Sequence, residues 1–329
     1  MACGAGFRRL LRGAIVLKGT VANTDRGWFE FLRGRPDLLE VNFWSPSPRQ
    51  AFRGEGNTPF FFRLKAPTKM VVGFAHFARY ERLPPWLAWE AFGDGNGVES
   101  LEELQARLTT LRDHIRYRPP PGPDEIGCIM LLEPVLFPPD LWVPEPADWM
   151  PRTQSYRYYD LTVGEGRRLW ERCLQSAREM TEARYDWTDR AWVDRAERYA
   201  EPHLVRPRLG QGTFRVATMQ AYERACAVTG EHSLPALDAA HIRPFALGGA
   251  HAVANGIFMR ADLHRLFDRG YLTVTPDLRL VVSSRLREDY ENGRTYYPLD
   301  GSLLREPRAV GERPSRELLR WHGDSVFQG

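Results

Sequence analysis

Lysine and long apolar runs are scarce in this chain of 329 residues. Lysine occurs only at Lys18, Lys65 and Lys69, so arginine makes up the rest of the 45 basic residues. No apolar run approaches the roughly 18 residues that a membrane-spanning helix needs. The N-terminal apolar stretch "AIVLKG" is too short for the core of a signal peptide. The sequence therefore predicts no membrane association.

Paired cysteines are also missing. The four cysteines, Cys3, Cys128, Cys173 and Cys226, are far apart and form no CxxC motif. This spacing argues against a disulfide framework and against a cysteine zinc site. We therefore expect reduced thiols and a cytoplasmic location.

The net charge of +3 is too small to indicate a nucleic-acid partner by itself. Arginine forks do suit phosphate, because the guanidinium binds two oxygens at once. Genomic base composition or thermal adaptation explains the same preference for arginine equally well. The composition is therefore compatible with DNA binding and does not require it.

Length and composition predict a globular protein of about two domains. Strand-rich segments alternate with short helices over residues 13–160, and the clearest helix follows Ser100, which is placed to cap it. We expect an α+β domain there, built on a sheet that can close into a barrel. Residues 161–205 predict a helical linker, with prolines and glycines from Glu201 to Gly212. A second domain then occupies residues 206–329, and Thr213 is a candidate cap for its first helix.

The stretch "LDAAHIRPFALGGAHAVANGIFMRADLHRLFDRG" concentrates histidine and aspartate in the second half. We expect His241 at the end of a short strand, Asn255 just before a helix, and His264 inside that helix. Asp268 lies four residues after His264, so both side chains share one helix face and can chelate one ion. Mixed nitrogen and oxygen ligands suit a divalent metal, with Mg²⁺ or Mn²⁺ expected and Zn²⁺, Co²⁺ or Ni²⁺ as alternatives.

These residue types fit phosphodiester hydrolysis. A histidine with an ordinary pKa near 6.5 can take a proton from water at neutral pH, which is the role open to His241. A metal held by His264 and Asp268 can neutralise phosphate charge. Asn255 can clamp the loop by binding its backbone. The hypothesis is thus a metal-dependent phosphodiesterase site.

The order of strand histidine, loop, asparagine and helix histidine resembles the HNH, or ββα-metal, endonuclease family of the bacterial restriction type. The resemblance extends over about 206–301 and includes "RPRLGQGTFRVATMQAYERACAVTG" and "LTVTPDLRL". It implies His241 as general base, Asn255 as the residue that orients the loop, and His264 as a metal ligand. Asp268 matches a position that can supply a second ligand.

One position departs from that family. Many HNH sites have an aspartate or histidine directly before the base, whereas this chain has Ala240. Asp238 is the nearest replacement as a metal ligand. Asp238 and His241 point to opposite faces of a regular strand, so we expect a bend or bulge if Asp238 serves.

Other side chains near this stretch are weaker candidates. Arg243, Arg260 and Arg265 flank the predicted site and are candidates for phosphate contacts. His251 lies in the loop "GGAHAV" and is best explained as an exposed loop histidine. Cys226 is expected to be a buried small residue.

The first half joins tryptophan to small polar residues in an unusual way. The segments "VANTDRGWFEFL" and "LLEVNFWSPSP" resemble the EVE branch of the PUA-like fold, a β-barrel with helices that includes readers of modified bases. The resemblance implies a pocket for a base flipped out of the duplex, which needs aromatic faces and polar edges. The candidates for this pocket are Asn23, Asp25, Trp28, Asn42, Trp44 and Ser45.

The two resemblances together predict a modification-dependent DNA endonuclease. It would bind double-stranded DNA, flip a modified base, most simply a modified cytosine, and cut the backbone in the HNH domain. Because one HNH site cuts one strand, a double-strand break predicts a homodimer or two independent nicks. Two alternatives stay open: an HNH endonuclease that senses phosphorothioate DNA, and a nucleic-acid-binding module with a degenerate nuclease site.

Overall fold

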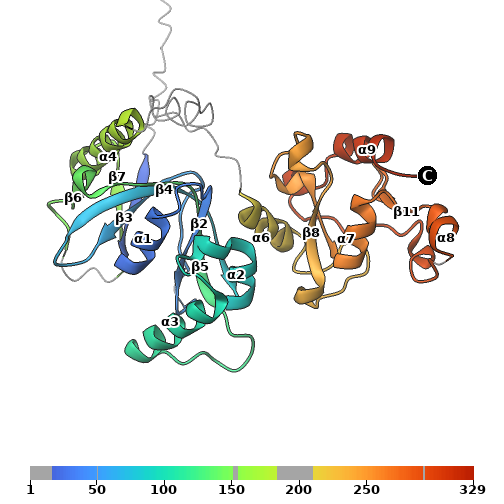
Figure 1. Cartoon of the computed structure of the whole chain (residues 1–329), viewed down its shortest axis with the longest axis horizontal. Coiled ribbons are helices and arrows are strands. Elements are labelled where there is room, and N and C mark those ends of the chain that lie inside the picture. The colour runs from blue at the N-terminus through green and yellow to red at the C-terminus, as the bar shows by residue number, and fades with distance from the viewer. Residues whose placement is uncertain (1–16, 50, 151–154, 184–209, 292) are drawn as a thin grey trace, which may run out of the picture. The chain divides into compact units, whose positions relative to one another are not determined.

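The computed structural model describes residues 17–49, 51–150, 155–183, 210–291 and 293–329 (Figure 1). Part of the predicted linker, residues 184–205, lies outside the described residues, as does Cys3. The described part of the chain contains no helix that combines the length and apolarity needed to cross a bilayer. Cys128, Cys173 and Cys226 are buried free thiols, as expected.

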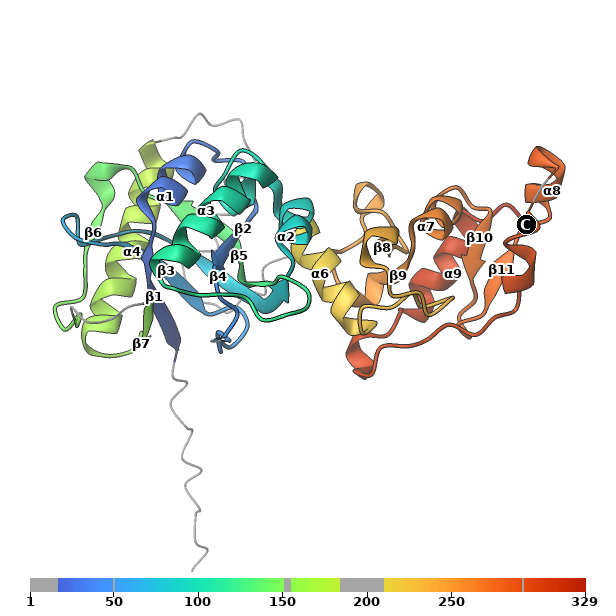
Figure 2. The same ribbon diagram turned by 90° about the horizontal axis from the view of Figure 1, so that it is seen from below.

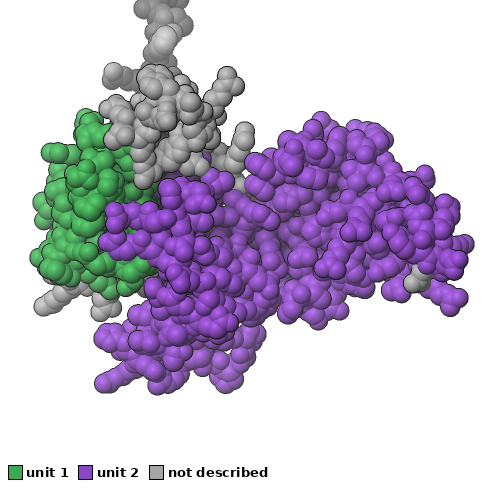
Figure 3. All heavy atoms as spheres, in the orientation of Figure 1, with its two compact units in different colours: residues 1–29, 58–75, 135–204 green, residues 30–57, 76–134, 205–329 purple. Residues whose placement is uncertain are grey.

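The chain divides into two compact units (Figure 3). Unit 1 comprises residues 1–29, 58–75 and 135–204, and unit 2 comprises residues 30–57, 76–134 and 205–329. Unit 2 therefore contains the whole C-terminal region together with part of the predicted N-terminal domain. The predicted domain boundaries stay a prediction.

In unit 1, strand β1 (Lys18–Thr24) pairs in parallel with β3 (Pro59–Leu64) and antiparallel with β7 (Tyr156–Asp160). β6 (Val143–Pro144) pairs with the start of β4 (Met70–Leu83). All six residues of β3 are buried. Trp170, from helix α4 (Gly164–Ala183), packs edge-on against Phe61 of this strand, at a centroid distance of 5.7 Å.

In unit 2, β2 (Glu40–Ser45) pairs antiparallel with β5 (Ile126–Leu136), from Glu40 opposite Leu132 to Ser45 opposite Gly127. The strand order of the sheet is β2-β5-β4-β3-β1-β7. The residues of β4 and of β5 are divided between the two units. Among the described residues, this path has free ends at β2 and β7. Sheet and helices together make the mixed α+β fold that the sequence predicted.

The helices begin and end close to their sequence signals. α1 (Arg26–Arg33) and α2 (Pro85–Phe92) are short, and Ser100 caps α3 (Leu101–His114) by accepting a hydrogen bond from the backbone N–H of Glu103. One expectation is wrong: α6 (Gln211–Ala221) begins before Thr213, and its N-cap is Gly210. Thr213 instead lies in the first turn, where its N–H and hydroxyl meet the carboxylate of Glu40.

The C-terminal region contains two small antiparallel sheets (Figure 2). β8 (Leu237–His241) pairs with β9 (Gly256–Arg260), and helix α7 (Ala261–Asp268) follows directly. β10 (Leu272–Val274) and β11 (Leu280–Val282) form an antiparallel hairpin. The remaining helices are α8 (Arg285–Tyr290), α9 (Arg316–Ser325) and seven short 3-10 turns among the described residues: Gly93–Asn96, Pro139–Leu141, Leu234–Ala236, Phe245–Leu247, Val253–Asn255, Tyr297–Leu299 and Val310–Glu312.

One hydrophobic core runs through unit 2. It contains Leu87 and Leu104 from α2 and α3, Met219 from α6, and Ile257 and Phe267 from β9 and α7. α6 thus packs between side chains that the sequence assigned to different domains. This placement decides what surrounds His241.

Candidate active site

β8, β9 and α7 bring the predicted C-terminal residues together. His241 is the last residue of β8 and lies opposite Gly256, the first residue of β9. Asn255 immediately precedes β9, so a strand separates it from the helix that was expected to follow directly. α7 begins only at Ala261 and carries His264 and Asp268.

His264 lies between two carboxylates. Its Nε2 is 3.2 Å from Asp268 Oδ2, as the spacing of four residues predicts, and its Nδ1 is 3.6 Å from Asp238 Oδ2. Burial opposes a charged imidazole, but hydrogen bonding to Asp238 and Asp268 outweighs burial and raises the pKa of His264 to about 9. The same hydrogen bond lowers the pKa of Asp238.

Asp238 reaches His264 without the bulge that we expected. All five residues of β8 pair one for one with β9, from Leu237 opposite Arg260 to His241 opposite Gly256. The strand is therefore regular, and Asp238 meets His264 because α7 packs against β8. The expectation of a bulge was wrong, whereas a ligand role for Asp238 stays a prediction.

The donor set suits a divalent cation that keeps several waters. Among the described residues, no three His, Cys, Asp or Glu side chains are already arranged as a complete metal site. A Mg²⁺-type site needs only one or two protein carboxylates, with water and phosphate completing the shell. His264 with one flanking carboxylate supplies two ligands, and the other carboxylate can hold the second ring nitrogen, as partners of metal-binding histidines do.

The Asn255 side chain closes the loop between β8 and β9. It is buried, its Oδ1 accepts a hydrogen bond from Arg243 N at 2.9 Å, and its Nδ2 donates to Arg243 O and Ala250 O, both at 2.9 Å. The loop also passes very close to itself at Gly249, where an added Cβ would lie 1.9 Å from Arg243 O. Only glycine fits there.

His241 is held between two other rings. Phe214 of α6 stacks on it, with ring centroids 3.9 Å apart and an interplanar angle of 17°. On the other side, His241 Nε2 and His251 Nδ1 lie 3.0 Å apart, at hydrogen-bonding distance. Burial lowers the pKa of His241 to about 4, and the repulsion that a protonated His251 or His264 would exert acts in the same direction. His241 is therefore neutral at pH 7.

His251 and Phe214 are site neighbours that the sequence did not reveal. His251 was expected to be a solvent-exposed loop residue, yet it is only partly exposed, and it stacks on Phe245 with centroids 4.7 Å apart and planes 7° apart. Its closeness to the motif was the available signal. Phe214 precedes His241 by 27 positions on a separate helix, and no local pattern marks it.

The three arginines proposed for phosphate contacts differ in their surroundings. The Arg243 Nε donates to Leu247 O at 2.7 Å, and its guanidinium lies 5.1 Å from the ring centroid of Trp321. The Arg260 guanidinium forks onto Asp262, with Nε 3.0 Å from Oδ1. Arg265 is exposed, and its charge helps to lower the pKa of Asp238. Of the three, Arg265 is therefore the most accessible to a phosphate.

Residues 226–275 match a protein family described as "HNH endonuclease". The C-terminal region carries an HNH endonuclease domain. The match covers His241, Asn255, His264 and Asp268, and it leaves out α6, which supplies Phe214. No curated protein matches the chain.

Several solved structures are similar to the chain. The ASCH protein of Zymomonas mobilis is 15% identical, with a TM-score of 0.33 over 46% of this chain and 94% of that one. A mutant form of the same protein is also 15% identical, with a TM-score of 0.31 over the same shares. A structure described as the modification-dependent TagI restriction endonuclease is 13% identical, with a TM-score of 0.29 over 94% of this chain and 81% of that one.

Outside the HNH domain, three of the six candidates for the base pocket belong to unit 1. Asp25 Oδ1 accepts a hydrogen bond from Trp28 N at 2.9 Å and so caps α1. Trp28 is only 4% exposed and packs on Phe62, with centroids 5.3 Å apart. Asn23 Oδ1 accepts a hydrogen bond from Arg63. These contacts give all three residues structural partners.

The other three candidates lie on β2 in unit 2. Asn42 is fully buried, and its Nδ2 donates to Asn96 Oδ1 at 2.9 Å. Trp44 is half-buried and donates from Nε1 to Asn96 O at 2.8 Å, while Ser45 Oγ donates to Ser47 O. Asn96 therefore organises this edge of β2, although it was not among the candidates.

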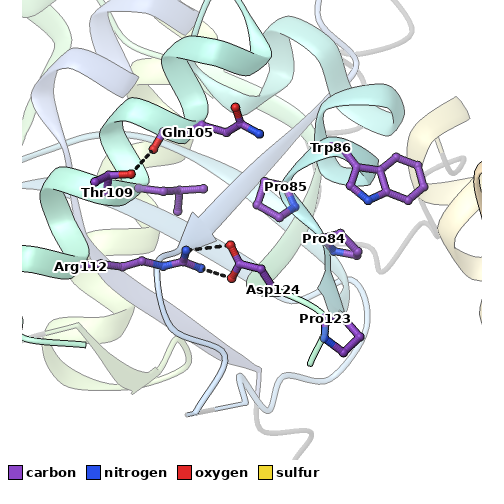
Figure 4. A pocket seen from close by; sticks show the side chains of 9 residues that line it. Pro84, Pro85, Trp86, Gln105, Thr109, Arg112, Pro123 and Asp124 are labelled. Carbon is purple, nitrogen blue, oxygen red and sulfur yellow. Dashed lines mark hydrogen bonds and ion pairs between the residues drawn. The ribbon is translucent and has the colours of Figure 1, made fainter. Parts of the chain in front are cut away.

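A separate hollow of about 410 Å³ also opens on unit 2 (Figure 4). Arg112 forks onto Asp124 at its edge, with distances of 2.9 Å and 2.7 Å, and Trp86 lies at the opposite side. None of the six base-pocket candidates lines it. The hollow is therefore distinct from the predicted reading site.

Proposed function

We propose that this protein is a DNA endonuclease that hydrolyses phosphodiester bonds in its HNH domain and selects its substrate through a modified base bound by the N-terminal region. The observation that carries the proposal is that β8 ends in a neutral histidine, His241, which lies within electrostatic reach of the His264–Asp268 pair on α7. A proton acceptor and a cation site within one ββα unit are what hydrolysis of a phosphodiester needs.

The chain's own residues divide the reaction between them. His241 accepts the proton of the attacking water, because its imidazole is neutral at pH 7. Asn255 keeps the loop after His241 closed through its three hydrogen bonds. His264 with Asp268 or Asp238 holds the divalent ion, which when bound supplies positive charge to the phosphate oxygens. Exposed Arg265 binds a neighbouring phosphate.

The reading step is assigned to the N-terminal region. Trp44 offers a half-buried aromatic face with Ser45 beside it on β2, a combination that suits stacking of an unpaired base with polar readout of its edge. A modified cytosine is the expected ligand.

Cleavage of a defined DNA panel tests this proposal. The substrates are one duplex carrying cytosine, methylcytosine, hydroxymethylcytosine, glucosylated cytosine, methyladenine or a phosphorothioate, each with Mg²⁺, Mn²⁺, Co²⁺, Ni²⁺ or Zn²⁺. We expect metal-dependent cutting of a base-modified duplex, lost in His241→Ala and retained in His232→Ala, because His232 is exposed and lies outside the site. Unchanged cutting by His241→Ala overturns the mechanism. Preference for phosphorothioate DNA overturns the base reader.

The ratio of nicked to linear plasmid during cleavage tests how both strands are cut. One HNH site handles one strand, so a homodimer should give linear plasmid without an accumulated nicked form. Independent nicking by monomers should accumulate the nicked form first. Sedimentation of the protein on the modified duplex identifies which species is present.

A further inference from the structure

We infer that His251 is a positioning residue for His241: it accepts a hydrogen bond from His241 Nε2–H and so keeps His241 Nδ1 free to take the proton from water. The inference deepens the proposed function and rests on it. It assigns a task to a histidine that the HNH pattern of His241, Asn255 and His264 leaves unused.

The geometry restricts both rings. Phe214 lies flat on His241 and fixes the plane of its imidazole, and Phe245 does the same for His251. Within these planes, His241 Nε2 and His251 Nδ1 are 3.0 Å apart, which is a normal hydrogen-bond length. Stacking alone fixes the plane of a ring but not which nitrogen carries the proton. The contact with His251 supplies that second restraint.

Only one arrangement of protons is compatible with a base at His241. A neutral imidazole has one N–H and one lone pair, on different nitrogens. If His251 donates from Nδ1, His241 must accept at Nε2 and carries its proton on Nδ1, so it has no lone pair left for water. If His241 donates from Nε2, its Nδ1 lone pair is free. The second arrangement requires a neutral His251 with its proton on Nε2.

The environment of His251 favours that neutral form. Burial lowers the pKa of His251, and the described groups that contact its ring are His241, Phe214 and Phe245, none of which carries a negative charge. His241 is in turn surrounded by Phe214 and His251, and its pKa also responds to the charges of His264 and Asp268. Once His241 is protonated, its Nε2–H bond to His251 becomes charge-assisted and holds the cation.

Two substitutions separate the hydrogen bond from the packing. His251→Phe keeps a ring against Phe245 and removes the acceptor. His251→Asn removes the ring and keeps an acceptor, because the asparagine Oδ1 occupies nearly the place of the histidine Nδ1. We expect kcat to fall roughly 10–100-fold in His251→Phe, a range typical of lost orienting partners, with KM unchanged. His251→Asn should retain most of the wild-type kcat.

A spectroscopic measurement on the full chain supplies a readout that packing does not move. With nitrogen-15 in the histidine rings, we expect wild-type His241 to be protonated on Nε2, and His251→Phe to show a mixture of both tautomers. The reverse activity pattern, with His251→Phe active and His251→Asn impaired, assigns His251 to packing and overturns the inference. A His241 protonated on Nδ1 in the wild type does the same.

The inference and the proposed function fail in different ways. Loss of activity in His241→Ala together with an unaffected His251→Phe refutes only the role of His251. A wild-type protein that cuts no DNA in the panel refutes the proposed function. In that case, the protonation state of His241 still shows whether His251 sets the tautomer.

Discussion

Glu40 and Thr213 are 173 residues apart in the sequence, and the carboxylate of one accepts hydrogen bonds from both the N–H and the hydroxyl of the other. Glu40 also accepts the N–H of Gly212 at 2.7 Å. Burial raises the pKa of Glu40, whereas these hydrogen bonds lower it in part. The carboxylate thus caps α6 from β2 and satisfies donors at the start of that helix.

Glu40→Ala should lower the free energy of unfolding by roughly 2–4 kcal/mol, because it leaves buried donors of Gly212 and Thr213 without an acceptor. Urea unfolding measures the change. Glu171→Ala is a matched control, since Glu171 pairs with Arg167 on an exposed helix face and such pairs contribute under about 1 kcal/mol. Equal effects of the two substitutions would refute the capping role.

Asn255→Asp should destabilise the loop between β8 and β9. The substitution keeps the acceptor for Arg243 N but places a carboxylate oxygen against the carbonyls of Arg243 and Ala250, which now receive an N–H. We expect faster hydrogen exchange in residues 243–250 and a loss of roughly 2–4 kcal/mol. Exchange rates equal to those of the wild type would show that the loop holds its shape without this side chain.

Metal binding should strengthen as pH rises from about 6.5 to about 9. Burial disfavours the charged form of His264, but hydrogen bonding to Asp238 and Asp268 prevails and raises its pKa to about 9, so an incoming ion must displace a proton. Calorimetry with Mn²⁺ in two buffers of different ionisation enthalpy measures that release. Asp268→Asn should weaken binding about tenfold or more, and Asp262→Asn, on the same helix but paired with Arg260, serves as control.

His322 should make stability depend on acid. Burial lowers the pKa of His322 to about 4 from an ordinary 6.5. Between these two pH values, His322 is protonated in the unfolded chain and neutral in the folded chain. The contribution is fully present above pH 6.5 and is lost as pH falls toward 4, by at most roughly 3 kcal/mol. His322→Asn should reduce the slope of unfolding free energy against pH in that window. His232→Asn, at an exposed site, should leave the slope unchanged.

Arg265 should contribute one phosphate contact. Arg265→Ala is expected to weaken binding to all duplexes alike and to reduce the slope of log affinity against log salt by about one. Arg260→Ala should change the slope less, because the guanidinium is already paired with Asp262. Fluorescence anisotropy over a salt series distinguishes these outcomes, and equal slopes for all three proteins would exclude Arg265 from the DNA contact.

Local periodicity predicted much of the fold and part of the site. The cap at Ser100 and the pairing of His264 with Asp268 both depend on residues within a few positions of one another. Asp238 was harder, because its closeness to His264 arises from α7 packing on β8 and not from a feature of the strand. Contacts such as Phe214 on His241 depend on tertiary packing, which no short pattern encodes.

The tryptophans show where composition alone is ambiguous. The sequence placed Trp28 and Trp44 together as pocket walls because each adjoins small polar residues. Trp28 is almost fully buried against Phe62, and its polar neighbour Asp25 caps a helix. Helix capping and base reading call for the same residue types, so composition alone cannot separate them.

The support of α6 by Glu40 bears on whether the C-terminal region can be separated from the rest of the chain. Phe214, whose ring stacks on His241, belongs to α6. Glu40 holds the start of α6, and an ion pair between Arg215 and Glu90 joins α6 to α2. A gene fusion that carried only residues 206–329 to a different N-terminal region would keep the HNH motif but lose these anchors. We therefore expect a transferred C-terminal region to keep the position of α6 only where its new neighbour supplies an equivalent acidic cap.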